Sequence, residues 1–207
     1  MTVIFSDTFT DTNGTNITSH TPDTDTPGSG WQYIGQIGNT PAGTEVTIQG
    51  NRWECSADHT GCGTDTGEVD VTISGDWDTT NTGDRNSIQF RWFSNVSSWR
   101  FNIRRGNSDI RLIKYATGDT VMDSSAYSYT TKTYPVQVVI SGNNIDCYLD
   151  GVLELSASGD SYNSTRTIQG ITRDAGGTSS HWDNFEIDDG ATGGGSEGAF
   201  HHYMANQ

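Results

Sequence analysis

The sequence has no long hydrophobic run, few basic residues and little cysteine. In 207 residues, 11 Lys and Arg stand against 26 Asp and Glu, which gives a net charge of −15. Such an acidic surface repels phosphate and argues against sequence-independent nucleic-acid binding. No stretch is long enough to cross a membrane, and the opening MTVIFSDTFT lacks the basic region of a secretory signal. We therefore expect a protein made in the cytoplasm, without nucleic-acid or membrane partners.

Cysteine pairs and catalytic motifs are also scarce. The three cysteines do not make a disulfide framework, and Cys147 lies in an apolar strand pattern typical of a core residue. Cys55 and Cys62 are either free thiols or the ends of a small bridged loop. His59 is the only nearby candidate zinc ligand, and no CxxC exists. The sequence has no serine nucleophile elbow, phosphate loop or HExxH motif.

Apolar and polar residues alternate along the chain, and no long 3.6-residue period occurs. Such alternation is typical of short strands joined by polar turns. We expect strands at residues 3–9, 31–36, 46–54, 68–73, 87–93, 99–104, 110–115, 136–141, 145–149, 152–156, 167–172 and 182–187. This pattern predicts an all-β, two-sheet antiparallel sandwich over residues 1–189, followed by a Gly-rich spacer and tail at 190–207.

The clearest local signal is VQVVISGNNIDCYLDGVLELSAS at residues 136–158. Asn143-Asn144 and Asp150-Gly151 are residue pairs that tolerate positive φ, so each suits a tight hairpin turn. The three runs that they separate are therefore expected to form an antiparallel meander.

Four segments occur in the order found in jelly-roll domains, namely FSDTFTDTNGT, GEVDVTISGDW, NNIDCYLDGVLEL and HWDNFEID. Together they resemble the concanavalin A-like lectin/glucanase jelly roll, in its laminin-G-like branch, over residues 3–188. The opening segment also resembles virion proteins of tailed bacteriophages. The resemblance implies the fold, but this fold carries enzymes, lectins and scaffolds, so it does not decide the activity.

One run invites comparison with the glucanases of that superfamily, which carry E-x-D-x-x-E or E-x-D-x-E on one strand. Here Glu68 and Asp70 match, but Thr72 or Ile73 stands where the second Glu belongs. Retaining glycosidases hold two carboxyls about 5–5.5 Å apart, whereas Glu68 and Asp70 would lie roughly 6–7 Å apart along a strand. We expect solvated or salt-bridged carboxylates on an outer face, no catalytic residues and no enzyme activity.

Seven of the 11 basic residues fall between residues 85 and 114. Alternation places Arg91, Arg100 and Arg104 on the face opposite the apolar side chains. This pattern predicts an arginine-rich face that docks an acidic partner surface. The alternative is cross-strand pairing with Asp and Glu of the same sandwich.

Trp31, Trp53 and Trp77 lie near expected loops and are candidates to stack on sugar rings, as tryptophans do in lectins. Packing in the core is the alternative for each, because a buried indole removes a large apolar area from water.

Hard oxygen ligands occur near both ends of the expected sandwich. Lectin-like jelly rolls often hold a structural calcium near the joined termini, so the resemblance makes Asp7, Asp11, Asn13 and Asp183 candidate calcium ligands. DTNG, which contains two of them, is also a simple turn sequence. We expect no other cofactor.

The chain ends in GGGSEGAFHHYMANQ, an apolar cluster behind a glycine spacer. The candidate partner-binding residues of this tail are Phe200, His201, His202, Tyr203 and Met204. A glycine leash would let the cluster reach a neighbouring subunit and bury its apolar area there. An expression remnant or a crystal contact is the alternative explanation.

These observations lead to three hypotheses. The first is a non-catalytic virion structural protein, a capsid decoration or cement protein that binds capsid or other virion subunits and is localised in the virion. The second is a carbohydrate-binding adhesin or a head or tail fibre module that recognises host polysaccharide. The third is an unusual glycosidase.

Overall fold

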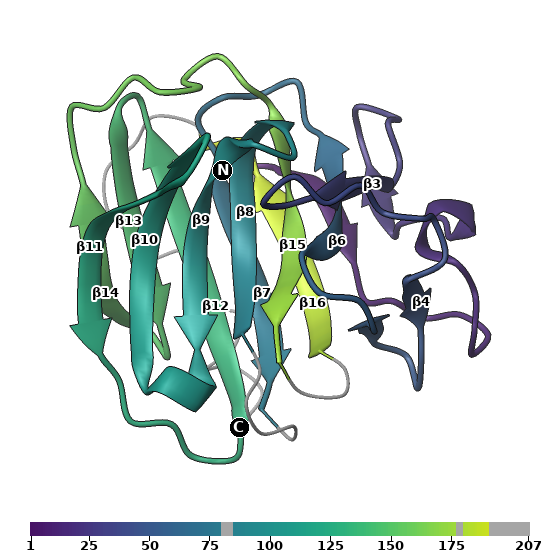
Figure 1. The fold of residues 1–207 in the computed structure, drawn as a ribbon. Coiled ribbons are helices and arrows are strands. Elements are labelled where there is room, and N and C mark those ends of the chain that lie inside the picture. The colour runs from purple at the N-terminus through teal and green to yellow at the C-terminus, as the bar shows by residue number, and fades with distance from the viewer. Residues whose placement is uncertain (80–84, 177–179, 191–207) are drawn as a thin grey trace.

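The computed structural model describes residues 1–79, 85–176 and 180–190. In this part of the chain two antiparallel sheets pack face to face (Figure 1), which confirms the all-β sandwich. Its two helical segments are single 3₁₀ turns, η1 (Ile17–Ser19) and η2 (Arg105–Asn107). No described helix has the length and apolar character that crossing a membrane requires. Phe200, His201, His202, Tyr203 and Met204 lie outside the described residues, so docking by the tail stays a prediction.

The strands divide between two sheets, here named sheet A and sheet B. Sheet A contains, in spatial order, β14 (Val152–Ala157), β13 (Asn144–Leu149), β12 (Thr133–Ser141), β7 (Thr72–Asp78), β16 (Ser180–Asp188), β1 (Val3–Asp7) and β2 (Thr24–Asp25), with β5 (Trp53–Cys55) pairing to β16 and to β4 (Val46–Ile48). Sheet B contains β11 (Asp119–Ala126), β10 (Asp109–Ala116), β9 (Ser97–Arg104), β8 (Arg85–Ser94), β15 (Ile168–Ala175), β6 (Thr60–Asp65) and β3 (Gln32–Gly35).

The predicted meander is confirmed as β12, β13 and β14, which pair antiparallel in sequence order. Asp150 and Gly151 have φ values of 55° and 80°, as a tight two-residue turn requires. The first turn lies one residue earlier than predicted. Because Ser141 pairs with Asn144, the turn residues are Gly142 and Asn143, and Gly142 takes the positive φ.

Two predicted strands are wrong in extent. The strand expected at 46–54 is a hairpin, β4 and β5, because Gly50 and Asn51 adopt positive φ and reverse the chain. The strand expected at 68–73 begins only at Thr72. Asp70 instead accepts a hydrogen bond from the backbone N–H of Gly142 at 2.8 Å. Glu68 and Asp70 therefore lie in the connection before β7, and the glucanase-like strand is absent from this position.

The core lies between the sheets and is rich in large aromatic side chains. Trp53, Trp77, Trp99 and Trp182 are fully buried there. All three cysteines are buried and free, so the bridge between Cys55 and Cys62 that the sequence left open does not form. Burial raises the pKa of the Cys55 thiol to about 12, which keeps it protonated and unreactive.

A β-bulge interrupts β8 at Arg91, whose φ is 48°. Pairing with β9 is regular up to Phe90–Trp99 and resumes only at Ser94–Ser97. An extra residue in a strand exchanges the faces of the side chains that follow it. Arg91 consequently reaches across to Gly142 of sheet A, whereas the Trp92 indole donates to the Gly35 carbonyl of sheet B at 3.1 Å.

Candidate functional site

The predicted arginine docking face is wrong for two of its three residues. Arg91 and Arg100 are almost completely buried, and Arg104 has a side chain only 12% exposed. Arg91 bonds to the Gly142 carbonyl. Arg100 forms an ion pair with Asp119. The alternative of pairing within the sandwich therefore holds for these side chains, and only Arg104 stays near the surface.

Arg100 belongs to a polar layer on the outer face of sheet B. Its guanidinium donates to the Gln36 side chain at 2.9 Å and lies 3.7 Å from the Asp174 carboxylate. Burial raises the pKa of Asp174, although the Arg100 charge acts against that shift. The Ser87 hydroxyl also donates to Asp174 at 3.0 Å. Arg100, Gln36, Asp174 and Ser87 thus have partners within the layer, although the Nε of Arg100 has no hydrogen-bond partner there.

This layer is covered because sheet B curls over itself. In a flat sheet β3 would lie about 14 Å from β8, three strand spacings away. Instead the Gly35 carbonyl at the end of β3 accepts hydrogen bonds from the side chains of Gln89 and Trp92. The curl brings the backbone of β15 close to Gly61 of β6. A side chain at this position would clash, because its Cβ would lie 2.1 Å from the Ile171 carbonyl oxygen. The middle of the outer face of sheet B is therefore closed to ligands.

The predicted tryptophan stacking sites are also wrong. Trp53 and Trp77 are fully buried, and Trp31 is buried against Phe5 and Phe185 with ring centroids 4.8 and 5.3 Å away. Packing in the core, the alternative, accounts for all three. None of them presents a ring face to a sugar.

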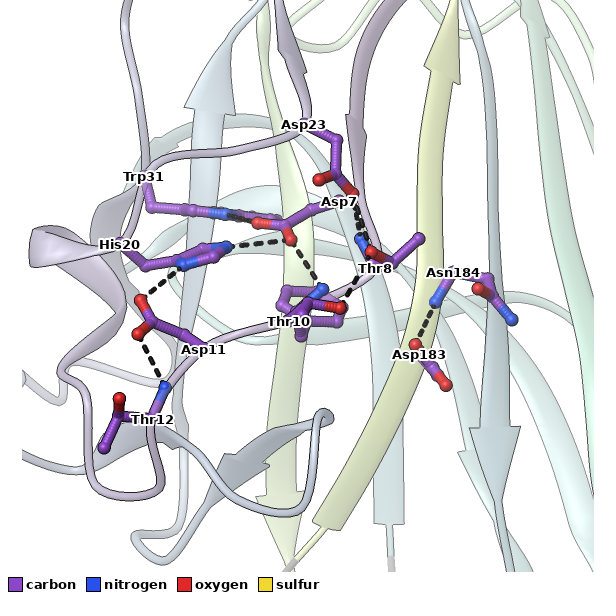
Figure 2. A network of polar contacts seen from close by, with 11 residues as sticks. Asp7, Thr8, Thr10, Asp11, Thr12, His20, Asp23, Trp31, Asp183 and Asn184 are labelled. Carbon is purple, nitrogen blue, oxygen red and sulfur yellow. Dashed lines mark hydrogen bonds and ion pairs between the residues drawn. The ribbon is translucent and has the colours of Figure 1, made fainter.

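A cluster of polar side chains fixes the N-terminal segment against the end of the sandwich (Figure 2). The Asp7 carboxylate is buried and accepts from the Trp31 indole at 2.6 Å and from the backbone N–H of Phe9 at 2.6 Å. The His20 ring lies between two carboxylates, 3.0 Å from Asp7 and 3.0 Å from Asp11. His20 thereby links β1 to the loop that carries η1.

The charges of this cluster are coupled. Burial raises the pKa of Asp7, and its hydrogen bonds to Trp31 and His20 act in the opposite direction. The hydrogen bond from His20 lowers the pKa of Asp11. Burial alone would lower the pKa of His20, but the bonds and charges of Asp11 and Asp7 together raise it. The arrangement favours an imidazolium held between two carboxylates.

The predicted calcium ligands do not fit a calcium site. The oxygens of Asp7 and Asp11 already accept protein hydrogen bonds, and Asn13 accepts from the backbone N–H of Gly50 at 2.8 Å. Asp183 lies apart from them on β16, where it accepts from Asn184 (Figure 2). Among the described residues no group of three or more His, Cys, Asp or Glu could hold a metal ion.

A second pair of carboxylates lies on sheet A. Asp76 of β7 stands directly opposite Asp183 of β16. Burial raises the pKa of both groups, and for Asp183 the nearby charge of Asp76 adds to the effect. The Asn184 side chain donates to Asp76 at 2.8 Å. When both carboxyls are ionised they repel each other, which lowers the stability of the folded protein.

Sequence reasoning missed the exposed apolar rim beyond the bulge in β8. Ile37, Phe93 and Val96 are exposed, and Phe93 is the most open at 53%. Ile37 and Val96 lie on two turns that are bonded together, since the backbone N–H of Gly38 donates to the Asn95 carbonyl at 2.9 Å, and Phe93 lies in β8 just before the second turn. We call these three residues the Phe93 rim. The two turns beside Phe93 come from distant parts of the chain, and alternation along one strand does not indicate that they meet.

The rim is held from a third side as well. The Asn163 side chain donates to the Arg91 carbonyl at 3.1 Å and to the Ser97 hydroxyl at 2.9 Å. The Arg166 guanidinium lies 3.8 Å from the centroid of the Phe93 ring. Asn95 also donates to the exposed Thr40 hydroxyl at 3.2 Å. These contacts hold the end of β8 in place, so the exposed Phe93 ring has a defined position.

No family model and no curated protein matches the sequence. Solved structures do match the fold. They include the carbohydrate-binding module CBM66 from Bacillus subtilis, at 15% identity and a TM-score of 0.63, with 77% of this chain and 96% of that chain covered. A glycosyl hydrolase family protein from Mycobacterium fortuitum matches at 10% identity and a TM-score of 0.59, over 91% of this chain and 100% of that one.

The GH43 protein BlXynB from Bacillus licheniformis matches at 12% identity and a TM-score of 0.58, over 76% of this chain. The match covers 36% of that enzyme, so this chain spans about a third of it. Such low identities establish a shared fold alone. The chain therefore has the β-sandwich that these neighbours share, in agreement with the concanavalin A-like resemblance.

Proposed function

We propose that this protein is a carbohydrate-binding module that contacts its glycan through the Phe93 rim. The observation that carries the proposal is the exposed Phe93 ring near the end of β8, beside two turns that are bonded together. The C–H face of a sugar ring packs on an aromatic ring, and ligand sites combine aromatic contacts with a few polar groups. Asn95, two residues after Phe93, and the exposed Thr40 supply such groups at the rim.

The comparisons favour glycan binding over the capsid hypothesis, because a carbohydrate-binding module is matched over 96% of its length. Binding and hydrolysis are distinguished by the residues instead, since a glycosyl hydrolase family protein is matched over 100% of its length. Nothing in the comparisons supports capsid decoration. Glu68 and Asp70, compared above with the glucanase pair, lie in a connection, and the Asp70 carboxylate accepts from the backbone N–H of Gly142, which gives no support to catalysis.

A glycan array followed by titration calorimetry tests the proposal. We expect the wild-type protein to bind at least one neutral glycan, and Phe93→Ala to weaken that binding about tenfold, since an aromatic contact is worth about 1 kcal/mol beyond its buried area. Leu153→Ala is the matched control, because Leu153 is equally exposed but lies on the edge strand β14.

The two possible failures have different meanings. A folded wild-type protein that binds no glycan on the array would show that the function is wrong. Glycan binding that Phe93→Ala leaves unchanged would show that the site is wrong while the function stands.

A further inference from the structure

At one end of β8, β9 and β10 the segment η2 connects β9 to β10 (Figure 1). Three arginines lie there on the outer face of sheet B. Pairing places Arg85 opposite Arg104, and Arg104 opposite Asp109. Arg111 follows two residues after Asp109 on the same face of β10, and its guanidinium contacts the same carboxylate. We call Arg85, Arg104 and Arg111 the arginine patch.

This arrangement breaks a rule that the rest of the sheet obeys. Like charges directly opposite each other on neighbouring strands destabilise a sheet. Burial lowers the pKa of Arg104, and the charges of Arg111 and Arg85 lower it further. In a chain with 26 acidic and 11 basic residues, two arginines are nevertheless placed face to face. Asp109 offsets part of this repulsion, and a local rule broken in this way points to a functional role.

The patch also keeps unused donors. One oxygen of Asp109 serves both neighbours, at 3.3 Å from Arg104 and 2.8 Å from Arg111. Each guanidinium has five N–H donors, so this single oxygen leaves several of them for another acceptor. The Arg111 side chain is 37% exposed, which makes its donors accessible from solvent.

We propose that the arginine patch binds the carboxylate of an acidic sugar, as found in a short uronic-acid oligosaccharide. Guanidinium forks match a carboxylate with two parallel hydrogen bonds. The choice of a sugar as ligand rests on the proposed carbohydrate-binding function. A short ligand is favoured because a net charge of −15 repels a long polyanion beyond the patch.

The patch is separate from the Phe93 rim. Arg85 begins β8 and Phe93 lies near its end, eight residues further, which corresponds to about 26 Å along an extended strand. The covered polar layer lies between them. The two sites can therefore be tested independently.

Titration calorimetry with uronic-acid trisaccharides tests the proposal. The panel contains galacturonate, glucuronate and mannuronate trimers, each beside its counterpart with the carboxyls reduced to hydroxymethyl groups. We expect at least one acidic trimer to bind about tenfold more tightly than its reduced form, the effect of one charge-assisted hydrogen bond. Arg111→Gln should lose that preference, and adding Arg85→Gln should weaken acidic-trimer binding further.

Arg52→Gln is the matched control, because Arg52 is equally exposed at 38% but lies outside sheet B and pairs with Asp78. Thermal melts of each variant check the fold. The proposal is overturned if no acidic trimer is preferred over its reduced form, or if Arg111→Gln and Arg52→Gln bind alike. Phe93→Ala should leave acidic-trimer binding unchanged, so loss of neutral-glycan binding and loss of this site are separate results.

Discussion

Replacing His20 with alanine should destabilise the protein in a pH-dependent way. His20 is 5% exposed and lies between Asp7 and Asp11, with 3.0 Å contacts to each. Its removal leaves the buried Asp7 carboxylate with two partners, the Trp31 indole and the backbone N–H of Phe9. An acidic group that loses a buried partner carries a desolvation cost that was previously offset.

The magnitude follows from these contacts. A hydrogen bond to a charged group contributes about 1.5–3 kcal/mol. Asp7 keeps two of its bonds and Asp11 is partly exposed, so we take the lower figure for each lost contact and expect a loss of about 3 kcal/mol. For a chain of this size 1 kcal/mol lowers Tm by roughly 2–4 °C, which gives a decrease of about 6–12 °C.

The pH dependence has a definite sign. The folded-state pKa of His20 lies above its ordinary value of 6.5. Its stabilising contribution is therefore fully present below pH 6.5 and is lost as the pH rises through the folded-state pKa. The difference in unfolding free energy between wild type and His20→Ala should be widest at pH 6 and narrower at pH 9, as measured by urea denaturation.

Asp7→Asn supplies the control. The amide oxygen still accepts from Trp31 but carries no charge for His20 to neutralise. In that background His20→Ala should cost less, by about 1 kcal/mol or more, because the two residues are in contact. If His20→Ala lowers the unfolding free energy by less than about 0.5 kcal/mol, or by the same amount at both pH values, a charged His20 between Asp7 and Asp11 does not stabilise the fold.

Two further substitutions test the sheets. Asp183→Asn should raise Tm at pH 7, because burial and the charge of Asp76 raise the pKa of Asp183, so that its ionisation costs stability. The gain should vanish at pH 3, where the carboxyl is protonated. An unchanged Tm at pH 7 contradicts this prediction. Gly61→Ala should cost about 3 kcal/mol in urea denaturation, since its Cβ would meet the Ile171 carbonyl, whereas Gly118→Ala, with open space around it, should be neutral.

The fold could be predicted wherever a strand carries its own signal. The meander of β12 to β14 was found because Asp and Gly residues mark the turns and apolar residues alternate between them. Three strands were missed, namely the two-residue β2 and the longer β6 and β11, and the last two were missed for opposite reasons. β6, TGCGTD, is buried and glycine-rich, whereas β11, DTVMDSSA, is polar and mostly exposed at a sheet edge. Each is defined by the strand beside it, and its own composition is not typical of a strand.

The site was harder to predict because it depends on two irregularities. The positive φ of Arg91 exchanges the faces of the residues after it, so alternation assigned Arg91 and Trp92 to the wrong sides. The curl of β3 then buries Arg100, which alternation correctly placed away from the core but could not show to be covered. A bulge and a curl arise from contacts between distant segments, and neither has a local pattern.

These two irregularities also separate the Phe93 rim from the outer face of sheet B, because Trp92 faces outward and Phe93, the next residue of β8, faces the other way. The Gly35 carbonyl bonds to Gln89 and Trp92, so the end of β3 lies across the middle of the face. A glycan cannot lie flat along the whole of β8, because the middle of its path is occupied by protein. Under the two proposals made above, the Phe93 rim and the arginine patch would bind separate sugars, or separate parts of a chain that leaves the surface between them. Their contributions to binding free energy should add without coupling, since no packed side chain is shared between the two ends.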